Sequence, residues 1–241
     1  MTGEIGRLRP ARNLPGRAAR KRRWGRRILL GAAALLALVV LGSWAFIKFQ
    51  PTSPPLALPA APASAPAGPL DGTWTVSGGS VAGFRVPETA FGMSNDTVGR
   101  TTAVRGTLVI SGGQVTSATF RVDLTAIKVN GKTQPQVARS LETRRFPAAT
   151  FTLARPAAPG SSLASGGTVR LTAAGRLSLN GVTRPVTVTL SGRRDGTALR
   201  VAGSIPVAFP AWGIKGPGGL GFAGSLADHG VAEFLITLHQ S

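Results

Sequence analysis

The chain has 241 residues, no cysteine and a formal net charge of +19. Without cysteine it forms no disulfide, no thiolate metal site and no lipid attachment through an N-terminal cysteine. Its two histidines, His229 and His239, are too few for a His-rich metal cluster.

The first predicted element is a transmembrane helix over residues 28–47, an uncharged stretch of twenty residues. Such a helix is about 30 Å long, the thickness of the hydrocarbon core of a bilayer. Residues 1–27 carry ten basic residues and one acid, which predicts a cytoplasmic N-terminus and an extracytoplasmic C-terminal domain. A cleaved secretory signal is the alternative, because small residues suited to a peptidase occur at 61–65. The apolar region of a signal is only about 7 to 15 residues long, so we expect a retained single-pass anchor in the cell membrane.

The stretch over residues 48–70 is rich in Pro, Ala and Ser, which predicts an extended linker. From residue 71 to residue 241 short alternating apolar and polar runs are separated by glycine-bearing turns. A length of about 170 residues suits one domain with a substantial core. The predicted organisation is a basic cytoplasmic tail (1–27), a transmembrane helix (28–47), a linker (48–70) and one outward-facing domain (71–241).

The net charge does not indicate nucleic-acid binding. Much of the excess lies in the N-terminal tail, and the basic residues of 71–241 are single or paired, with no aromatic stacking platform between them. We expect a solvated surface that leans toward anionic lipid headgroups.

An apolar period of two predicts the strands of the domain. Seven or eight such runs without helix–strand alternation indicate an antiparallel barrel or a sandwich, and the pattern alone does not choose between them. The apolar positions are Ala82, Phe84, Val86; Val104, Gly106, Leu108, Ile110; Ala118, Phe120, Val122, Leu124; Val169, Leu171, Ala173; Leu177, Leu179; Val186, Val188, Leu190; Leu199, Val201, Gly203, Ile205; and Ala232, Phe234, Ile236, Leu238.

Three dipeptides predict turns between these runs. Asn180-Gly181 is the strongest hairpin signal, because both residues tolerate the positive φ angles of a type I′ turn. Gly112-Gly113 and Asp195-Gly196 are signals of the same kind. Residues 134–145, with Val137 and Leu141 four apart, predict one short helix.

Two motifs in order resemble the YceI-like family: FPAATF at residues 146–151 and GRLSLNGVTRPV at 175–186. The family consists of bacterial envelope proteins with a lipocalin-like antiparallel barrel around an isoprenoid or other long apolar chain. The resemblance spans roughly residues 71–240 and implies the all-β barrel with a short helix. Where many relatives have Asn-Arg-Ser-Asp-Phe-Gly, this chain has AFPAWG at 208–213, so any role of that arginine is absent here.

With that resemblance, we expect a lipid-binding interior without a cofactor or metal, in which a slender apolar chain is the ligand. Each inward residue has the alternative interpretation of plain core. The candidate ligand-binding residues are Ala82, Phe84, Val86, Leu108, Ala118, Phe120, Val122, Leu177, Leu179, Val188, Val201, Gly203, Trp212, Phe222, Phe234 and Ile236.

No catalytic constellation is found, so we expect no enzyme. There is no GxSxG-like elbow, the eight acids of the domain are dispersed, and Asp228-His229 is better interpreted as a turn before the last strand. The glycines of 216–221 lead toward another strand rather than a helix, which predicts a rim loop instead of a phosphate cradle. Such a loop would lie beside Phe209, with Arg184 and Lys215 near a headgroup. A non-enzymatic envelope interaction module with a filled core is the alternative function. The sequence does not identify the lipid, its transport or storage, protein partners or the oligomeric state.

Overall fold

The computed structural model describes residues 53–61, 65–90, 93–216 and 224–241. The predicted transmembrane helix and cytoplasmic tail lie outside these residues. By contact clustering the chain divides into Met1–Pro51 and Thr52–Ser241, and the description below concerns the second unit. Within the described ranges, no helix has the length and apolar character needed to cross a bilayer.

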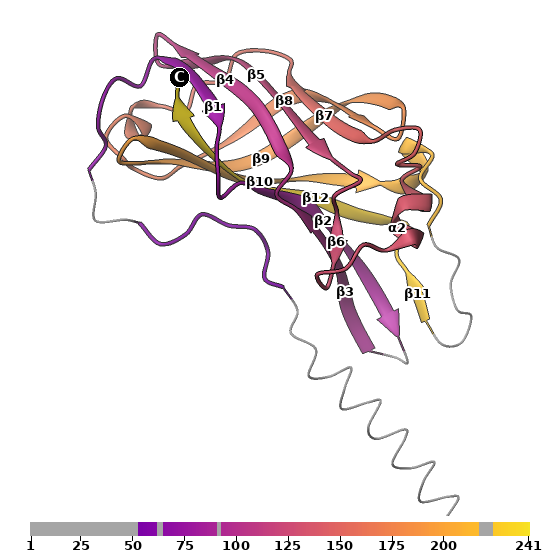
Figure 1. Cartoon of the computed structure of the whole chain (residues 1–241). Coiled ribbons are helices and arrows are strands. Elements are labelled where there is room, and N and C mark those ends of the chain that lie inside the picture. The colour runs from indigo at the N-terminus through magenta and orange to yellow at the C-terminus, as the bar shows by residue number, and fades with distance from the viewer. Residues whose placement is uncertain (1–52, 62–64, 91–92, 217–223) are drawn as a thin grey trace, which may run out of the picture. The chain divides into compact units, whose positions relative to one another are not determined.

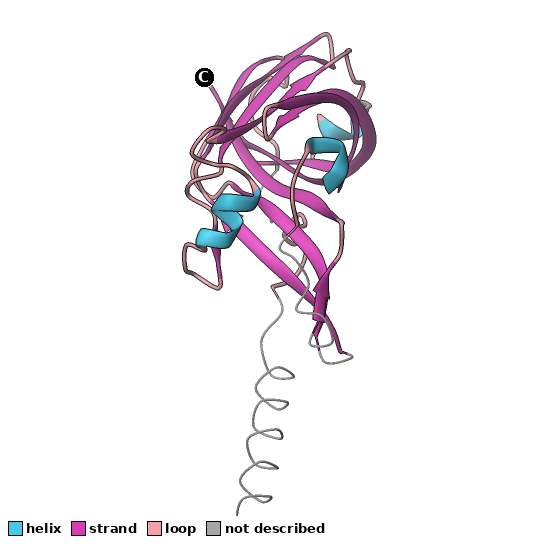
Figure 2. Ribbon diagram, turned by 90° about the vertical axis from the view of Figure 1, so that its right-hand side faces the viewer, coloured by secondary structure: helices cyan, strands magenta, loops and turns pink. Residues whose placement is uncertain are grey.

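Eight antiparallel strands of the second unit close into a barrel (Figure 1). The ring closes because β12 pairs with β10 along its length and with β1 near its C-terminal end. Figure 2, turned by 90° from Figure 1, shows these strands curving round into a ring. The ring strands, in spatial order, are β1 (Gly72–Val76), β4 (Val104–Ser111), β5 (Gln114–Asp123), β7 (Ala148–Leu153), β8 (Val169–Leu179), β9 (Val182–Asp195), β10 (Ala198–Ala208) and β12 (His229–Gln240).

A second group of strands extends the sheet from the N-terminal half of β12. β2 (Val81–Ala90) pairs with β12 and with β3 (Met93–Thr101), and β3 pairs with the two-residue β6 (Lys128–Val129). The short β11 (Gly224–Leu226) pairs with the end of β2. The sequence pattern therefore predicted the fold class correctly, and the structure decides for a barrel over a sandwich.

Tight turns connect the long hairpins at the predicted places. β8 and β9 are joined by Asn180 and Gly181, with φ angles of 51° and 76°, which is the left-handed backbone of a type I′ turn. Gly112 and Gly113, with φ angles of 57° and 71°, likewise join β4 to β5, and the carboxylate of Asp71 accepts hydrogen bonds from both glycine N–H groups.

One α-helix, α2 (Pro135–Ser140), is found in the described residues, alongside the 3₁₀ turns η1 (Ser161–Leu163) and η2 (Phe209–Trp212). α2 is shorter than the predicted 134–145 because Glu142 takes a φ of 43° and ends it. The N–H groups of Glu142 and Thr143 donate to the carbonyls of Arg139 and Ala138, the pattern of a Schellman C-cap.

The barrel has two ends, which we name by their landmarks. The α2 end carries α2, η2 and the 180–181 turn. The hairpin end carries the 112–113 turn and the turn between β9 and β10, whose Gly196 has a φ of 61°.

Candidate functional site: the inner face of the barrel

Two apolar clusters lie inside the barrel, one toward each end. The cluster at the hairpin end contains the most deeply buried side chains, Trp74, Ile110, Leu199 and Leu238, with exposed fractions of 0 to 2%. The cluster at the α2 end contains Leu124, Ile127, Leu177, Leu179, Val188, Ile205, Val207, Trp212 and Ile214.

Side chains between the two clusters are less completely covered. Phe84, Phe120, Val201 and Phe234 lie on the inner face, pack against a cluster and keep part of their surface exposed. Phe234 packs against both clusters, which places it between them. A solid protein interior is packed about as densely as an organic crystal, so mid-strand residues of a filled barrel would be almost fully covered. These residues therefore keep apolar surface that the chain's own side chains do not cover.

Phenylalanine rings on the inner face lie over glycines of the neighbouring strand. Phe84 is paired with Gly99 across β2–β3, and a Cβ atom added to Gly99 would meet the ring first. Phe120 is likewise paired with Gly106 and Phe234 with Gly203, but there an added Cβ would meet a backbone carbonyl oxygen first and the ring next. The ring of Phe151 on β7 covers Gly175 of β8 in the same way.

These glycines let each large ring lie along the barrel wall. An aromatic ring over a strand glycine covers the backbone that lacks a side chain, which is the arrangement known as aromatic rescue. A ring held against the wall occupies less of the central space than one that projects into it. The inner face consequently presents flat apolar surface from four strands.

The predicted ligand-binding residues gather on this inner face, with one exception. Phe222 lies outside the described residues. Val122 is paired with Val104 of β4, which packs against the hairpin-end cluster, and with Ala149 of β7, which packs against the α2-end cluster. Gly203 lies under the ring of Phe234. Members of the clusters, or residues packed against them, are Phe84, Leu108, Ala118, Phe120, Leu177, Leu179, Val188, Val201, Trp212, Phe234 and Ile236, and Ala82 and Val86 are each 4% exposed.

The sequence prediction missed several inner residues. Phe151 was seen only as part of a motif, although its neighbours Ala149 and Leu153 continue a period of two along β7. Trp74 is fully buried and donates from its indole Nε1 to the carbonyl of Leu70 at 3.0 Å, which holds β1 at the hairpin end. A single tryptophan before a glycine-bearing turn gives no periodic signal.

Polar contacts fix the backbone at the α2 end. The side chain of Asn180 donates from Nδ2 to the carbonyl of Trp212 at 3.1 Å, and Arg184 donates from Nε to the carbonyl of Ala211 at 2.6 Å. Trp212 itself is only 5% exposed. Arg184, predicted to face a headgroup, thus binds the η2 backbone, whereas Lys215 is exposed.

A cluster of charged side chains lies on the outer face, where β2, β3 and β12 adjoin. Glu233 is 4% exposed and lies 2.6 Å from Arg100 Nη2 and 3.4 Å from Arg85 Nε, while Arg85 also pairs with Asp96 at 2.8 Å. Buried charges persist when they are paired, and each charge of this cluster has a partner of opposite sign, although Arg85 Nε and Glu233 Oε1 make no hydrogen bond.

The 53–61 segment, predicted as part of an extended linker, runs over this cluster. Arg85 donates to the carbonyl of Ser53 at 2.6 Å, and the N–H of Leu56 donates to the Glu233 carboxylate at 3.1 Å. Farther along the segment, Arg193 donates to the carbonyls of Pro59 and Ala60. The described part of the linker is therefore bound to the barrel wall.

Arginines at the hairpin end also serve the structure. Arg194 is 3% exposed, donates to the carbonyls of Ala67 and Gly68, and lies 5.7 Å from the centre of the Trp74 ring. The hydrogen bond to Asp195 raises the pKa of Arg193 above its ordinary value, although burial acts in the opposite direction. The prediction of a generally solvated basic surface is wrong for these side chains.

The remaining candidate chemistry is sparse. His229 and Asp228 lie 3.0 Å apart but are largely exposed at the start of β12, as expected for a turn element. Among the described residues, no group of three or more His, Cys, Asp or Glu side chains could hold a metal ion. A pocket is lined by residues 155–158, by residues 171–174 of β8 and by Thr187 of β9.

The family model for the YceI-like domain matches residues 74–235, which is the barrel from β1 into β12. The chain belongs to the YceI-like domain family. The matched range includes both motifs from which the resemblance was first inferred.

Two solved structures align with this chain. A polyisoprenoid binding domain from Saccharophagus degradans, implicated in plant cell wall breakdown, aligns with a TM-score of 0.55 and 14% identity over 71% of this chain and 99% of that chain. Burkholderia cenocepacia BcnA aligns with a TM-score of 0.48 and 17% identity over 64% of this chain and 95% of that chain. No curated protein matches. At these identities the likeness concerns the fold alone.

Proposed function

We propose that this YceI-like barrel binds a long apolar chain, an isoprenoid or a fatty chain, between its two apolar clusters. The observation that carries the proposal is the band of partly exposed inner residues with phenylalanine rings held against the wall by glycines. Two further facts support it: the family match, and a structural neighbour that is itself described as a polyisoprenoid binding domain.

The chemistry of this band suits binding and nominates no catalytic step. Its side chains are aliphatic and aromatic, so the free energy of binding would come from apolar surface removed from water. Each buried CH₂ group contributes about 0.8 kcal/mol. Affinity should therefore rise with the length of the ligand chain and depend little on its headgroup.

Native mass spectrometry of gently purified full-length chain, followed by organic extraction, tests the proposal. A co-purified lipid, or uptake of labelled prenols with affinity that rises with length, is expected. A protein that is empty and takes up neither labelled prenols nor labelled fatty acids would refute it, and would favour the filled-core interaction module.

A pair of substitutions locates the binding site. Val201→Trp adds an indole on the partly exposed inner face of β10, whereas Thr189→Trp adds the same group on the exposed outer face of β9. Uptake of labelled prenol should fall with Val201→Trp and remain with Thr189→Trp. Equal uptake by both variants would place the ligand outside the barrel.

We further propose that residues 28–47 anchor the barrel to the cell membrane with the barrel extracytoplasmic, as the charge asymmetry indicates. Because the chain has no cysteine, a single introduced cysteine reports its own location. In intact bacterial cells a membrane-impermeant maleimide should label Gln114→Cys in the barrel but not Thr2→Cys in the tail. The reverse labelling would contradict the orientation, and a mature mass that lacks the chain up to the small residues at 61–65 would show a cleaved signal.

A further inference from the structure

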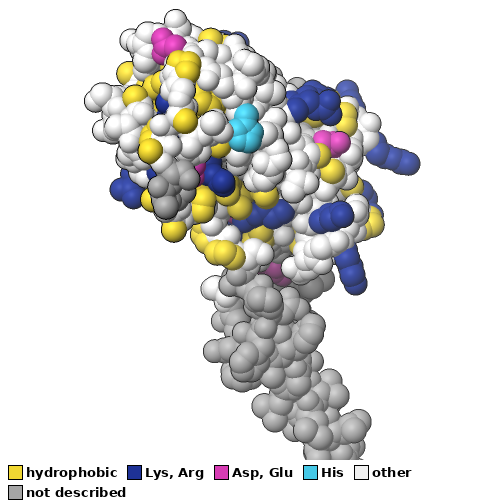
Figure 3. Space-filling view, turned by 60° about the vertical axis from the view of Figure 1, so that its left-hand side comes forward, with side chains coloured by type: hydrophobic (Ala, Val, Ile, Leu, Met, Phe, Trp, Pro, Cys, Tyr) yellow, Lys and Arg dark blue, Asp and Glu magenta, His cyan; other side chains and the backbone are white. Residues whose placement is uncertain are grey.

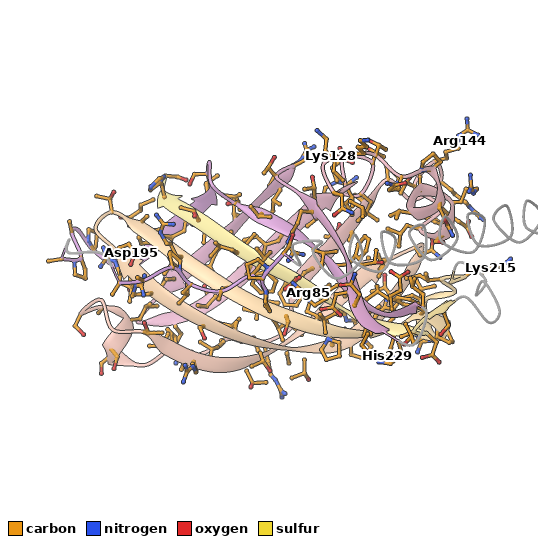
Figure 4. The ribbon with its side chains drawn as sticks, turned by 90° about the horizontal axis from the view of Figure 1, so that it is seen from below. Arg85, Lys128, Arg144, Asp195, Lys215 and His229 are labelled. Carbon is orange, nitrogen blue, oxygen red and sulfur yellow. The ribbon has the colours of Figure 1, made fainter. Side chains whose placement is uncertain are left out.

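Exposed basic side chains gather at one end of the barrel. Figure 4 places Arg144 and Lys215 at the α2 end, Lys128 nearer the middle of the barrel and Asp195 at the opposite end. In the segment 124–147, which forms much of the α2 end, exposed basic residues outnumber acids. They are Lys128, Lys132, Arg139, Arg144 and Arg145 against the single acid Glu142.

One of these side chains contacts an aromatic ring, since Arg145 lies 5.0 Å from the centre of the Phe146 ring. None of them belongs to an ion pair found within the described residues, in contrast to the arginines of the outer-face cluster. One face of the molecule in Figure 3 shows how Lys and Arg spread over the surface while Asp and Glu are sparse.

The hairpin end is different, because most of its charges are paired or buried, although Arg155 and Arg170 there are exposed. Asp195 pairs with Arg193 at 2.7 Å and with Arg200 at 2.9 Å. Arg194 is buried and donates to backbone carbonyls, and the Asp71 carboxylate faces the 112–113 turn. Among the described residues, the α2 end therefore carries more exposed basic side chains outside ion pairs than the hairpin end does.

The bound 53–61 segment shortens the tether between the barrel and the predicted membrane span. As a free extended linker, residues 48–70 would reach about 70 Å at roughly 3.1 Å per residue. With Ser53 and Leu56 held on the barrel, only residues 48–52 remain, which reach about 17 Å at most. If residues 28–47 span the bilayer, the barrel stays close to its surface.

We propose that the α2 end of the barrel binds an anionic phospholipid surface. Basic residues near such a surface are attracted by its negative potential, about five-fold in binding per residue, and the attraction fades within about 10 Å at 0.1 M salt. The apolar cluster with Trp212 and Ile214 lies at the same end, so a chain leaving the bilayer there would meet apolar side chains. The proposal uses the predicted span but needs no bound ligand.

Dye quenching on full-length protein in vesicles tests this orientation. Gln136→Cys on α2 and Gln114→Cys at the hairpin end are matched exposed sites, separated by the length of β5, which is about 30 Å. Each variant is labelled with one fluorophore and reconstituted into vesicles of zwitterionic lipid with about a third phosphatidylglycerol. Headgroup spin-labelled lipid should quench the dye at position 136 strongly and the dye at position 114 little.

Salt, lipid charge and protein charge provide the controls. Quenching at position 136 should fall in 1 M salt, where the screening length is about 3 Å, and in vesicles without anionic lipid. The combined substitution Arg139→Gln, Arg144→Gln and Arg145→Gln should shift the bound-to-unbound ratio about a hundred-fold, with an unchanged unfolding midpoint. Equal quenching at both positions, or quenching insensitive to salt, lipid charge and the triple substitution, would overturn the proposal. Because the quenching readout needs no ligand, it tests membrane contact of the α2 end independently of lipid binding inside the barrel.

Discussion

Gly99→Ala tests whether glycines hold the phenylalanine rings against the barrel wall. The added Cβ atom would lie 2.6 Å from Phe84 Cζ and 2.9 Å from Ile127 Cγ2, and its nearest neighbours are all side-chain atoms. Carbon atoms pack at about 3.5 to 4.0 Å. The Phe84 ring must therefore move by about 1 Å, toward the interior.

The expected cost follows from two opposing effects. Overpacking a core costs about 1 to 3 kcal/mol, whereas replacing a strand glycine by alanine recovers about 0.5 to 1 kcal/mol. Gly99→Ala should lower the free energy of unfolding by about 0.5 to 2 kcal/mol, or by roughly 2 to 4 °C in melting temperature for each kcal/mol. Denaturant unfolding of the full chain in mild detergent, followed by tryptophan fluorescence, measures this.

A matched glycine and a double mutant complete the test. Gly192 is buried on β9, and an added Cβ would find nothing closer than 3.7 Å, so Gly192→Ala should be neutral or stabilise by up to about 1 kcal/mol. Phe84→Leu removes the ring and should relieve most of the cost of Gly99→Ala, with a coupling of about 1 to 2 kcal/mol. If the effects of Gly99→Ala and Phe84→Leu on the free energy of unfolding are additive to within about 0.5 kcal/mol, the ring-over-glycine argument is refuted. If the interior holds a lipid, Gly99→Ala alone should also reduce uptake of labelled prenol.

Three further predictions concern the polar framework. Glu233→Gln removes the carboxylate shared by two arginines and should destabilise the barrel by about 1 to 3 kcal/mol in denaturant unfolding, whereas exposed Glu142→Gln should have no measurable effect. The hydrogen bond from the hydroxyl of Thr125 holds the pKa of Asp123 below its ordinary value. Asp123 therefore stabilises the fold fully above its unfolded-state pKa, near 3.9. This contribution is lost as the pH falls through the lower folded-state pKa. Thr125→Val should move that pKa upward in an NMR titration, and an unmoved pKa would contradict the assignment. Asn180→Ala should cost about 2 kcal/mol, because it places alanine at positive φ and removes a buried hydrogen bond, and a cost similar to that of Thr183→Ala next to the turn would count against it.

The period of two predicted most of the barrel because hydrophobic burial alternates along a strand. It found the inner faces of β2, β4, β5, β9, β10 and β12, but it divided β8 into two runs at Gly175. Gly175 is an inner position too, filled from outside the strand by the ring of Phe151. A hydrophobicity pattern counts such a glycine as a gap.

The same effect hid β3. Its sequence, MSNDTVGRT, shows no apolar alternation, and its inner position Gly99 is covered by Phe84 from β2. The apolar side chain buried at that point is supplied by Phe84, which is 15 positions away from Gly99 in the sequence. Pattern reasoning along one strand cannot find a position whose apolar surface is supplied by another strand.

The bound linker escaped prediction for a different reason. Nothing in a Pro- and Ala-rich segment indicates a docking site, because the contacts use its backbone carbonyls and one N–H rather than its side chains. The recognising groups are Arg85, Arg193 and Glu233, which are far away in the sequence and look like ordinary surface charges there.

Because the linker is bound to the barrel, several arginines of the domain are occupied within the chain. Arg85, Arg100, Arg193 and Arg194 contribute to the formal charge, yet each donates to backbone carbonyls or pairs with a carboxylate, so they offer little to a partner. Most of what remains at the two ends is the exposed basic surface of the α2 end, which a count of charges along the sequence does not separate from the rest. If residues 28–47 form the proposed membrane anchor, the same arginines that hold the 53–61 segment also limit how far the barrel can move from it. A variant that releases this segment, such as Arg85→Gln, should weaken the contact of the α2 end with anionic vesicles although it alters no residue at that end.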